Sequence, residues 1–192
     1  VDDATEWSTV FRLPRGLVLL LGVLCFVSFL AEGSMLDWSA VLLRDFRGFS
    51  AASAGIGYAC FSVAMAAGRL AGDRVVERLG PVSAVRIGAS TAAIGFLLAA
   101  MAPWPAASLS GFVLIGLGAS NIVPVMFSAA GRLPGNPPAI SIAAVTMLGY
   151  AGLLSGPALI GFMAHASNLP VALAVVAGLL LLVAGSARIV RR

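Results

Sequence analysis

Long apolar stretches alternate with short charged segments along the chain. Six such stretches lie at about 16–36, 50–71, 82–102, 106–128, 139–163 and 168–187. Each has the roughly 20 residues that a helix needs to cross the hydrocarbon core of a bilayer. A single segment in lipid can satisfy its backbone hydrogen bonds only as a helix, so each is predicted to be helical. The pattern therefore predicts an all-α bundle of six transmembrane helices over residues 16–192.

The composition supports a polytopic membrane protein. Of the 192 residues, 60% are hydrophobic and 10% are charged, whereas ordinary soluble domains carry roughly 25% charged residues. A soluble fold of this length leaves exposed roughly a third of the surface of its unfolded chain. With this composition, many apolar side chains would then lie in water. The lipid bilayer is therefore the expected surroundings of the chain.

The arginines predict the orientation of the bundle. An even number of spans puts both termini on one side, and loops on the cytoplasmic side carry an excess of basic residues. Only Arg44 and Arg47 fall on the other side. The arginines on the side of the termini are Arg12, Arg15, Arg69, Arg74, Arg78, Arg86, Arg132, Arg188, Arg191 and Arg192. We therefore expect both termini in the cytoplasm of a bacterial inner membrane, with residues 1–15 as the end of a cytoplasmic linker. Arginines scattered at span ends do not form a nucleic-acid interface.

Glu32 is the ionisable residue that lies deepest in a predicted span. A charged side chain within a membrane span is a functional candidate by default, because it needs a partner, a water-filled cavity or a proton. Glu32 fits this description if its helix continues past residue 36 to about residue 43; otherwise it lies near the end of the span. The nearby Asp37 and Trp38 favour the second case, with Trp38 in the interfacial belt and Asp37 in water. Glu32 and Asp37 are both candidate cavity or proton-site residues.

Two uncharged polar residues complete the candidate cavity set. Asn121 precedes Pro124 within the fourth stretch. A proline removes a helix hydrogen bond and kinks the span, and the asparagine could bond the freed groups or a solute. Tyr150 in the fifth stretch could direct its hydroxyl into a cavity or serve as a core aromatic.

No enzyme motif is visible. The sequence has no glycine-rich phosphate loop, no H-E-x-x-H and no G-x-S-x-G, and its single histidine, His165, falls in a predicted loop. Cys25 and Cys60 lie inside apolar stretches, without metal-ligand spacing. We expect no catalytic residues, no metal and no cofactor.

The charges of residues 67–80, AGRLAGDRVVERLG, follow a specific order between the second and third stretches. Arg69 and Asp73 are four residues apart and would share a face if the second helix continued that far. The order resembles the signature loop of the major facilitator superfamily, in which a glycine and an apolar residue precede Asp-Arg and a later glycine. This loop maps onto Gly68, Leu70, Asp73, Arg74 and Gly80. The Gly68–Asp73 spacing is one residue longer than usual, and Pro81-Val82 replaces the usual basic pair. The replacement of the basic pair is typical of the weaker, second copy of this loop.

The resemblance covers nearly the whole chain and implies a function. Segments 32–39 and 149–157 are similar to a bacterial subgroup related to sugar–proton symporters of the fucose permease type and to rhizopine-associated membrane proteins. The chain then corresponds to the C-terminal half of a twelve-helix transporter, built from two inverted three-helix repeats. Its partner would be an N-terminal six-helix half that this chain lacks. The resemblance implies alternating-access, proton-coupled transport of a small solute, as symport or efflux. It also implies a gating loop of Gly68, Arg69, Asp73, Arg74 and Gly80, with Asp73 as a latch beside Arg69 and Arg74.

Two other functions are compatible with the same residues. The chain could be a membrane structural or assembly protein that has the fold and transports nothing. It could also be a self-standing six-helix carrier that works as a homodimer. Binding of a solute would separate the first alternative from a transporter, and the length of the natural chain would test the second.

Overall fold

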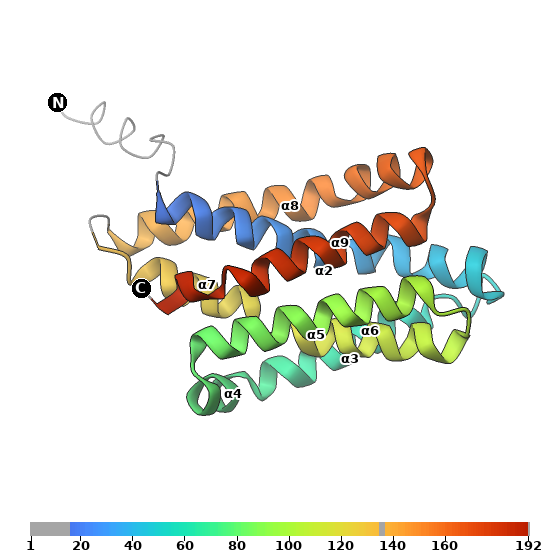
Figure 1. Cartoon of the computed structure of the whole chain (residues 1–192), viewed down its shortest axis with the longest axis horizontal. Coiled ribbons are helices and arrows are strands. Elements are labelled where there is room, and N and C mark those ends of the chain that lie inside the picture. The colour runs from blue at the N-terminus through green and yellow to red at the C-terminus, as the bar shows by residue number, and fades with distance from the viewer. Residues whose placement is uncertain (1–15, 135–136, 192) are drawn as a thin grey trace.

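The computed structural model describes residues 16–134 and 137–191, and these residues form helices joined by short turns (Figure 1). The predicted all-α class is confirmed, and the predicted linker end at 1–15 lies outside the described residues. The helices are α2 Leu17–Arg47, α3 Ile56–Leu70, α4 Gly72–Leu79, α5 Pro81–Met101, α6 Pro105–Ala119, α7 Ile122–Gly131, α8 Pro138–Ala166, α9 Leu169–Gly185 and the 3-10 helix η1 Ala187–Arg191.

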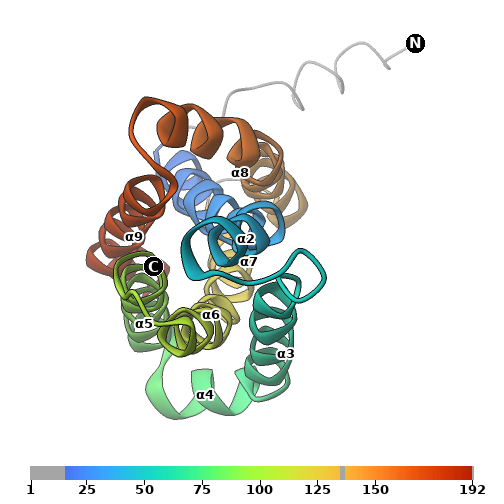
Figure 2. The same ribbon diagram turned by 90° about the vertical axis from the view of Figure 1, so that its right-hand side faces the viewer.

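The longer helices run alongside one another, and α4 lies across one end of the bundle (Figures 1 and 2). Four segments are long and apolar enough to cross a membrane: Leu17–Arg47, Pro81–Met101, Pro105–Gly131 and Pro138–Ala166. The apolar helices α3 and α9 are shorter, at 15 and 17 residues. A span of about 17 residues is the lower limit for an untilted crossing, so α9 reaches it and α3 does not.

Helix α2 is longer than the first predicted span. It continues through Trp38 to Arg47 and ends at Gly48, which has a left-handed conformation with φ 73°. The N–H of Phe49 then bonds the carbonyl of Leu43 at 3.1 Å, which closes the helix end. The predicted end of this helix near residue 36 is therefore wrong. Trp38 is half-buried, and its ring packs beside Gly161 of α8.

The fourth predicted span consists of two helices, α6 and α7, which meet at Ser120 and Asn121. Pro124 was the predicted cause of a kink, but it occupies the third position of α7. Backbone N–H groups in the first turn have no partner within a helix, so a proline costs little there. The break instead lies where Asn121 reaches across to α3.

The packing partners reveal two related three-helix units. The first unit comprises α2, α3 and α5, and the second comprises α6–α7, α8 and α9. Helix α2 packs on α8, α3 packs on α6, and α5 packs on α9. In this division α2 corresponds to α6–α7, α3 to α8, and α5 to α9. Replacing each helix by its counterpart turns the α2–α8 pair into the α6–α3 pair and leaves the α5–α9 pair as it is. Because α2 and α6 start at opposite ends of the bundle (Figure 1), the units have the inverted topology found in many secondary transporters.

Small residues allow the closest of these contacts. A Cβ atom on Gly152 of α8 would collide with the carbonyl of Phe26 on α2. A Cβ on Gly68 of α3 would lie 2.5 Å from Ser120 Oγ. Close helix approach through small residues is a main source of association between membrane helices, where water provides no driving force.

Candidate functional site

Glu32 lies at the midpoint of α2, about 22 Å from either end at the rise of an α-helix. Its Oε2 atom accepts a hydrogen bond from Nη2 of Arg69, on α3, at 3.3 Å. The side chain of Glu32 is 12% exposed and that of Arg69 is 49% exposed. The pair therefore joins a largely buried carboxylate to a cation that remains accessible.

The pair borders a cavity of about 440 Å³ between α2, α3 and α8. Tyr58, Ser62 and Leu153 also line it. Glu32 Oε1 and Ser62 Oγ are buried and find no hydrogen-bond partner among the described residues. Polar groups left in this way are uncommon inside proteins, so they indicate a place for water, a proton or a solute.

The backbone of α8 has a carbonyl without its usual helical partner near this cavity. Pro157 lies inside α8 and has no N–H to donate to the carbonyl of Leu153, four residues earlier. Leu153 lines the cavity, and its carbonyl oxygen is 3.2 Å from the position a Cβ would occupy on Gly33. The absence of a side chain at Gly33 keeps α2 close to this carbonyl.

The other predicted cavity residues are not brought together with Glu32. Asp37 is exposed, and no ion pair within the described residues includes it. The ring of Tyr150 stacks on Phe29 at a centroid distance of 5.4 Å and is 51% exposed. Tyr150 is one helical turn from Leu153, so it lies beside the cavity rather than in its wall.

Asn121 contributes to a different contact. Its Nδ2 atom donates to the carbonyl of Gly68 at 3.2 Å and to Ser120 Oγ at 3.0 Å. Gly68 lies in the last turn of α3, where carbonyls lack a partner within the helix. Asn121 thus ties the break between α6 and α7 to the junction between α3 and α4.

The predicted gating residues divide between two helices. Arg69 lies in the last turn of α3, Asp73 and Arg74 lie in α4, and Gly80 ends α4 with φ 76°. The chain turns at Ala71, so Arg69 and Asp73 do not share a helix face as expected. Within the described residues Arg69 pairs with Glu32, and no ion pair includes Asp73.

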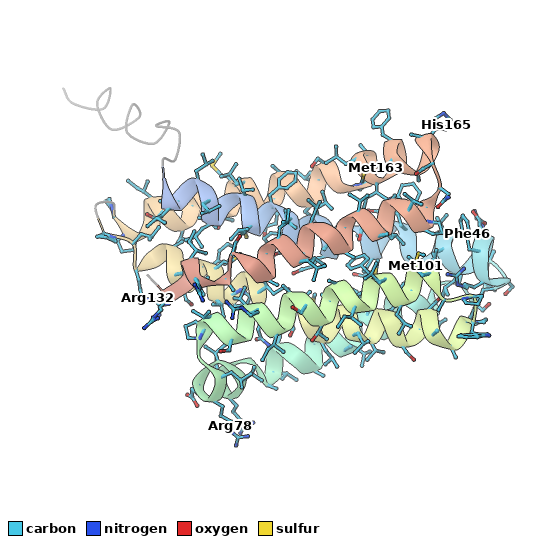
Figure 3. All side chains as sticks on the ribbon, viewed as in Figure 1. Phe46, Arg78, Met101, Arg132, Met163 and His165 are labelled. Atoms are coloured by element: carbon cyan, nitrogen blue, oxygen red, sulfur yellow. The ribbon has the colours of Figure 1, made fainter. Side chains whose placement is uncertain are left out.

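The sequence interpretation missed Tyr58 and Ser62 in the cavity wall. These residues and Arg69 follow one face of α3, because they are separated by four and then seven positions. A polar stripe within an otherwise apolar stretch is the signal that could have identified this wall. His165 lies in the last turn of α8, at the end of the bundle away from Arg78 and Arg132 (Figure 3). It is therefore not part of the cavity wall.

A second arginine with partners inside the bundle, Arg47, was also missed. Its Nη2 atom donates to the carbonyls of Ala99 and Ala100, each at 2.9 Å, and its Nε atom donates to Ser108 Oγ at 2.9 Å. The two carbonyls belong to the last turn of α5, where backbone acceptors have no partner within the helix. The carbonyl of Ala99 also accepts a hydrogen bond from Ser108 Oγ at 3.1 Å. Arg47 therefore holds the end of α2 to α5 and α6.

A bundle of apolar helices with two inverted three-helix units, and with a cavity that holds an ion pair near its middle, defines a membrane protein of the transporter-fold class. The fold of the fucose:proton symporter FucP of E. coli agrees with this chain at a TM-score of 0.83 and 19% identity, over 100% of this chain and 46% of FucP. No known protein-family profile matches the chain.

Relatives in sequence give the family. An uncharacterized MFS-type transporter of Yersinia pestis is 52% identical over 183 residues, 95% of this chain and 48% of that protein. Membrane protein MosC of Rhizobium meliloti is 34% identical over 152 residues, 79% of this chain and 37% of MosC. The chain belongs to the major facilitator superfamily. It spans about half the length of the curated relatives it matches.

Proposed function

We propose that the chain is the C-terminal half of a proton-coupled secondary transporter that moves a small polar solute by alternating access. The Glu32–Arg69 pair carries this proposal. It places a carboxylate at the middle of a membrane helix, beside a cavity with unpaired polar groups. Ionisable residues at such depth mark solute or proton pathways in membrane proteins.

The position of the cavity fits alternating access. In transporters built from inverted repeats, the solute site lies near the membrane midplane, between the parts that move. Here α2, α3 and α8 form one wall, and an N-terminal six-helix half is proposed to form the other. The half-length match to the relatives and the FucP fold support this pairing.

Proton coupling follows from the chemistry of Glu32. Protonation would neutralise the carboxylate, weaken its bond to Arg69 and leave the guanidinium free to bind a solute oxygen. Solute and proton would then bind together, which is the requirement for symport. FucP is described as a fucose:proton symporter, so a sugar or related polar solute is the first class to test.

The arginine distribution supports a cytoplasmic position for both termini in a bacterial inner membrane. The end that carries Arg74, Arg78, Arg86, Arg132, Arg188 and Arg191, called here the arginine-rich end, would then face the cytoplasm. Helix α4 lies across this end (Figure 1). We propose that Asp73 of α4 contacts the N-terminal half and forms the gate in that contact.

The direct test is a transport assay on the intact transporter that contains these residues. Purified protein in proteoliposomes would be offered sugars, amino acids and drugs, with and without an imposed pH gradient. We expect one class to accumulate only with the gradient. A lack of any accumulation, together with no solute-dependent rise in thermal stability, would instead favour a non-transporting membrane protein. Equal activity of the 192-residue chain alone would favour a homodimeric carrier.

A further inference from the structure

A second cavity, of about 320 Å³, lies at the arginine-rich end of the bundle. Helices α3 and α5 form its walls, α6 forms its floor, and α4 lies at its rim. Ala67 and Gly68 of α3 line it, whereas Ser62 and Arg69 line the Glu32 cavity. At 100° per residue these two pairs lie on opposite faces of α3, so the cavity is a separate groove.

The groove is lined mainly by apolar side chains and glycines. Its exposed margin includes Ile87 of α5, which is 52% exposed, and Leu117 of α6, which is 44% exposed. Neither α2 nor α8 contributes to it. An open groove with this apolar lining, on a helix bundle in a membrane, suits the acyl chain of a lipid.

The charged residues of α4 lie beside and behind its groove-lining face, in a defined order. Val75 and Leu79 line the groove. The exposed Arg74 and Arg78 precede them by one residue each, so they form the adjoining stripe of the helix. Asp73 and Glu77 form the stripe about 160° from the groove-lining pair. The rim of the groove is therefore basic, and Arg78 extends away from the bundle (Figure 3).

We propose that this groove binds an anionic phospholipid of the cytoplasmic leaflet. One acyl chain would lie in the groove, against Ile87 and Leu117. The headgroup phosphate would be held by Arg74 and Arg78. Guanidinium groups bind phosphate oxygens through paired hydrogen bonds, and basic side chains at the cytoplasmic surface attract anionic lipids. The proposal rests on charge complementarity at the rim together with apolar lining below it, and it is independent of the transported solute.

The test measures lipid binding to the intact transporter by native mass spectrometry after removal of endogenous lipid. Phosphatidylglycerol and phosphatidylcholine of the same acyl composition are titrated separately, and soluble glycerol phosphate is added as a competitor. We expect tighter binding of phosphatidylglycerol and little competition, because glycerol phosphate lacks the chain that fills the groove. Equal affinity for the two lipids would overturn the proposal.

Three variants separate the rim from the groove. The double variant Arg74→Gln/Arg78→Gln should weaken phosphatidylglycerol binding about 25-fold, about fivefold for each arginine near the surface, and leave phosphatidylcholine unchanged. Its matched control, Asp73→Asn/Glu77→Gln on the far stripe, should not weaken binding. Ala71→Phe, at a residue that lines the groove, should weaken both lipids.

The salt dependence of the unmodified protein provides a measurement that needs no variant. Raising the salt concentration from about 50 to about 500 mM should weaken phosphatidylglycerol binding and spare phosphatidylcholine, because exposed charges are screened. Unchanged phosphatidylglycerol binding in high salt, or in folded Arg74→Gln/Arg78→Gln protein, would show that the rim does not hold the phosphate. Unchanged binding in folded Ala71→Phe protein would show that the chain lies elsewhere.

Discussion

Arg47 and Arg69 both direct a guanidinium group into the bundle, but their partners are of different kinds. Arg47 bonds two backbone carbonyls and the hydroxyl of Ser108, all neutral groups on α5 and α6. Arg69 bonds the carboxylate of Glu32 at the edge of a cavity. Neutral backbone acceptors stay uncharged at any pH, whereas a carboxylate loses its charge when it binds a proton.

The difference separates a fixed contact from one that can switch. The Arg47 contact satisfies carbonyls at a helix end and has no titratable partner, so it is suited to holding α2, α5 and α6 together. The Arg69 contact has one titratable partner and an exposed cation, so a proton and a solute can both compete for it. Loss of Arg47 is therefore expected to lower stability more than transport, and loss of Arg69 is expected to lower transport more than stability.

The largest effect on stability is expected from Arg47→Ala. The variant loses the charge-assisted hydrogen bonds that Arg47 makes to two carbonyls in the last turn of α5. This loss should lower the free energy of unfolding by about 3 kcal/mol. Thermal unfolding of the intact transporter would measure the loss of stability. Arg44→Ala is the matched control, because Arg44 is at the same helix end and, among the described residues, pairs only with the neighbouring Asp45. Equal unfolding of the two variants would remove the proposed role of Arg47.

A smaller effect on stability and a clear effect on transport are expected from Arg69→Gln. Half-exposed ion pairs contribute about 0–1 kcal/mol, so unfolding should change little. Solute uptake should fall about tenfold, because the cavity loses the only cation in its described wall. Initial uptake rates over a range of solute concentrations would measure this fall. If Arg69→Gln lost as much stability as Arg47→Ala and kept its uptake, the Arg69 contact would be structural, contrary to this prediction.

The sequence predicted the class of fold because apolar stretches of membrane length leave the backbone few choices. It did not predict where α2 ends, because Asp37 and Trp38 resemble the end of a span. In the structure Asp37 points outward and Trp38 packs beside Gly161, so both are accommodated within the helix. The outcome depended on a contact with α8, more than 100 residues later in the chain.

The candidate site was predicted in part. Glu32 was selected because its charge lies within an apolar stretch, and that reasoning needs no tertiary contact. Its partner was not predicted, because the four-residue spacing favoured Asp73 as the partner of Arg69. The turn at Ala71 separates those two residues, and packing of α3 near α2 brings Arg69 to Glu32 instead. Asn121 proved to be a link to Gly68 rather than part of the Glu32 cavity.

The central claim is that Glu32 carries the coupled proton, and the most direct measurement follows proton movement during solute transport. Proteoliposomes of the intact transporter would be given solute while the external pH is recorded, and exchange of labelled solute would be measured in parallel. The unmodified protein and Asp37→Asn, a change at an exposed carboxylate on the same helix, should both take up protons with solute. Glu32→Gln should exchange solute without moving protons. Proton uptake by Glu32→Gln at the unmodified ratio to solute would contradict the account.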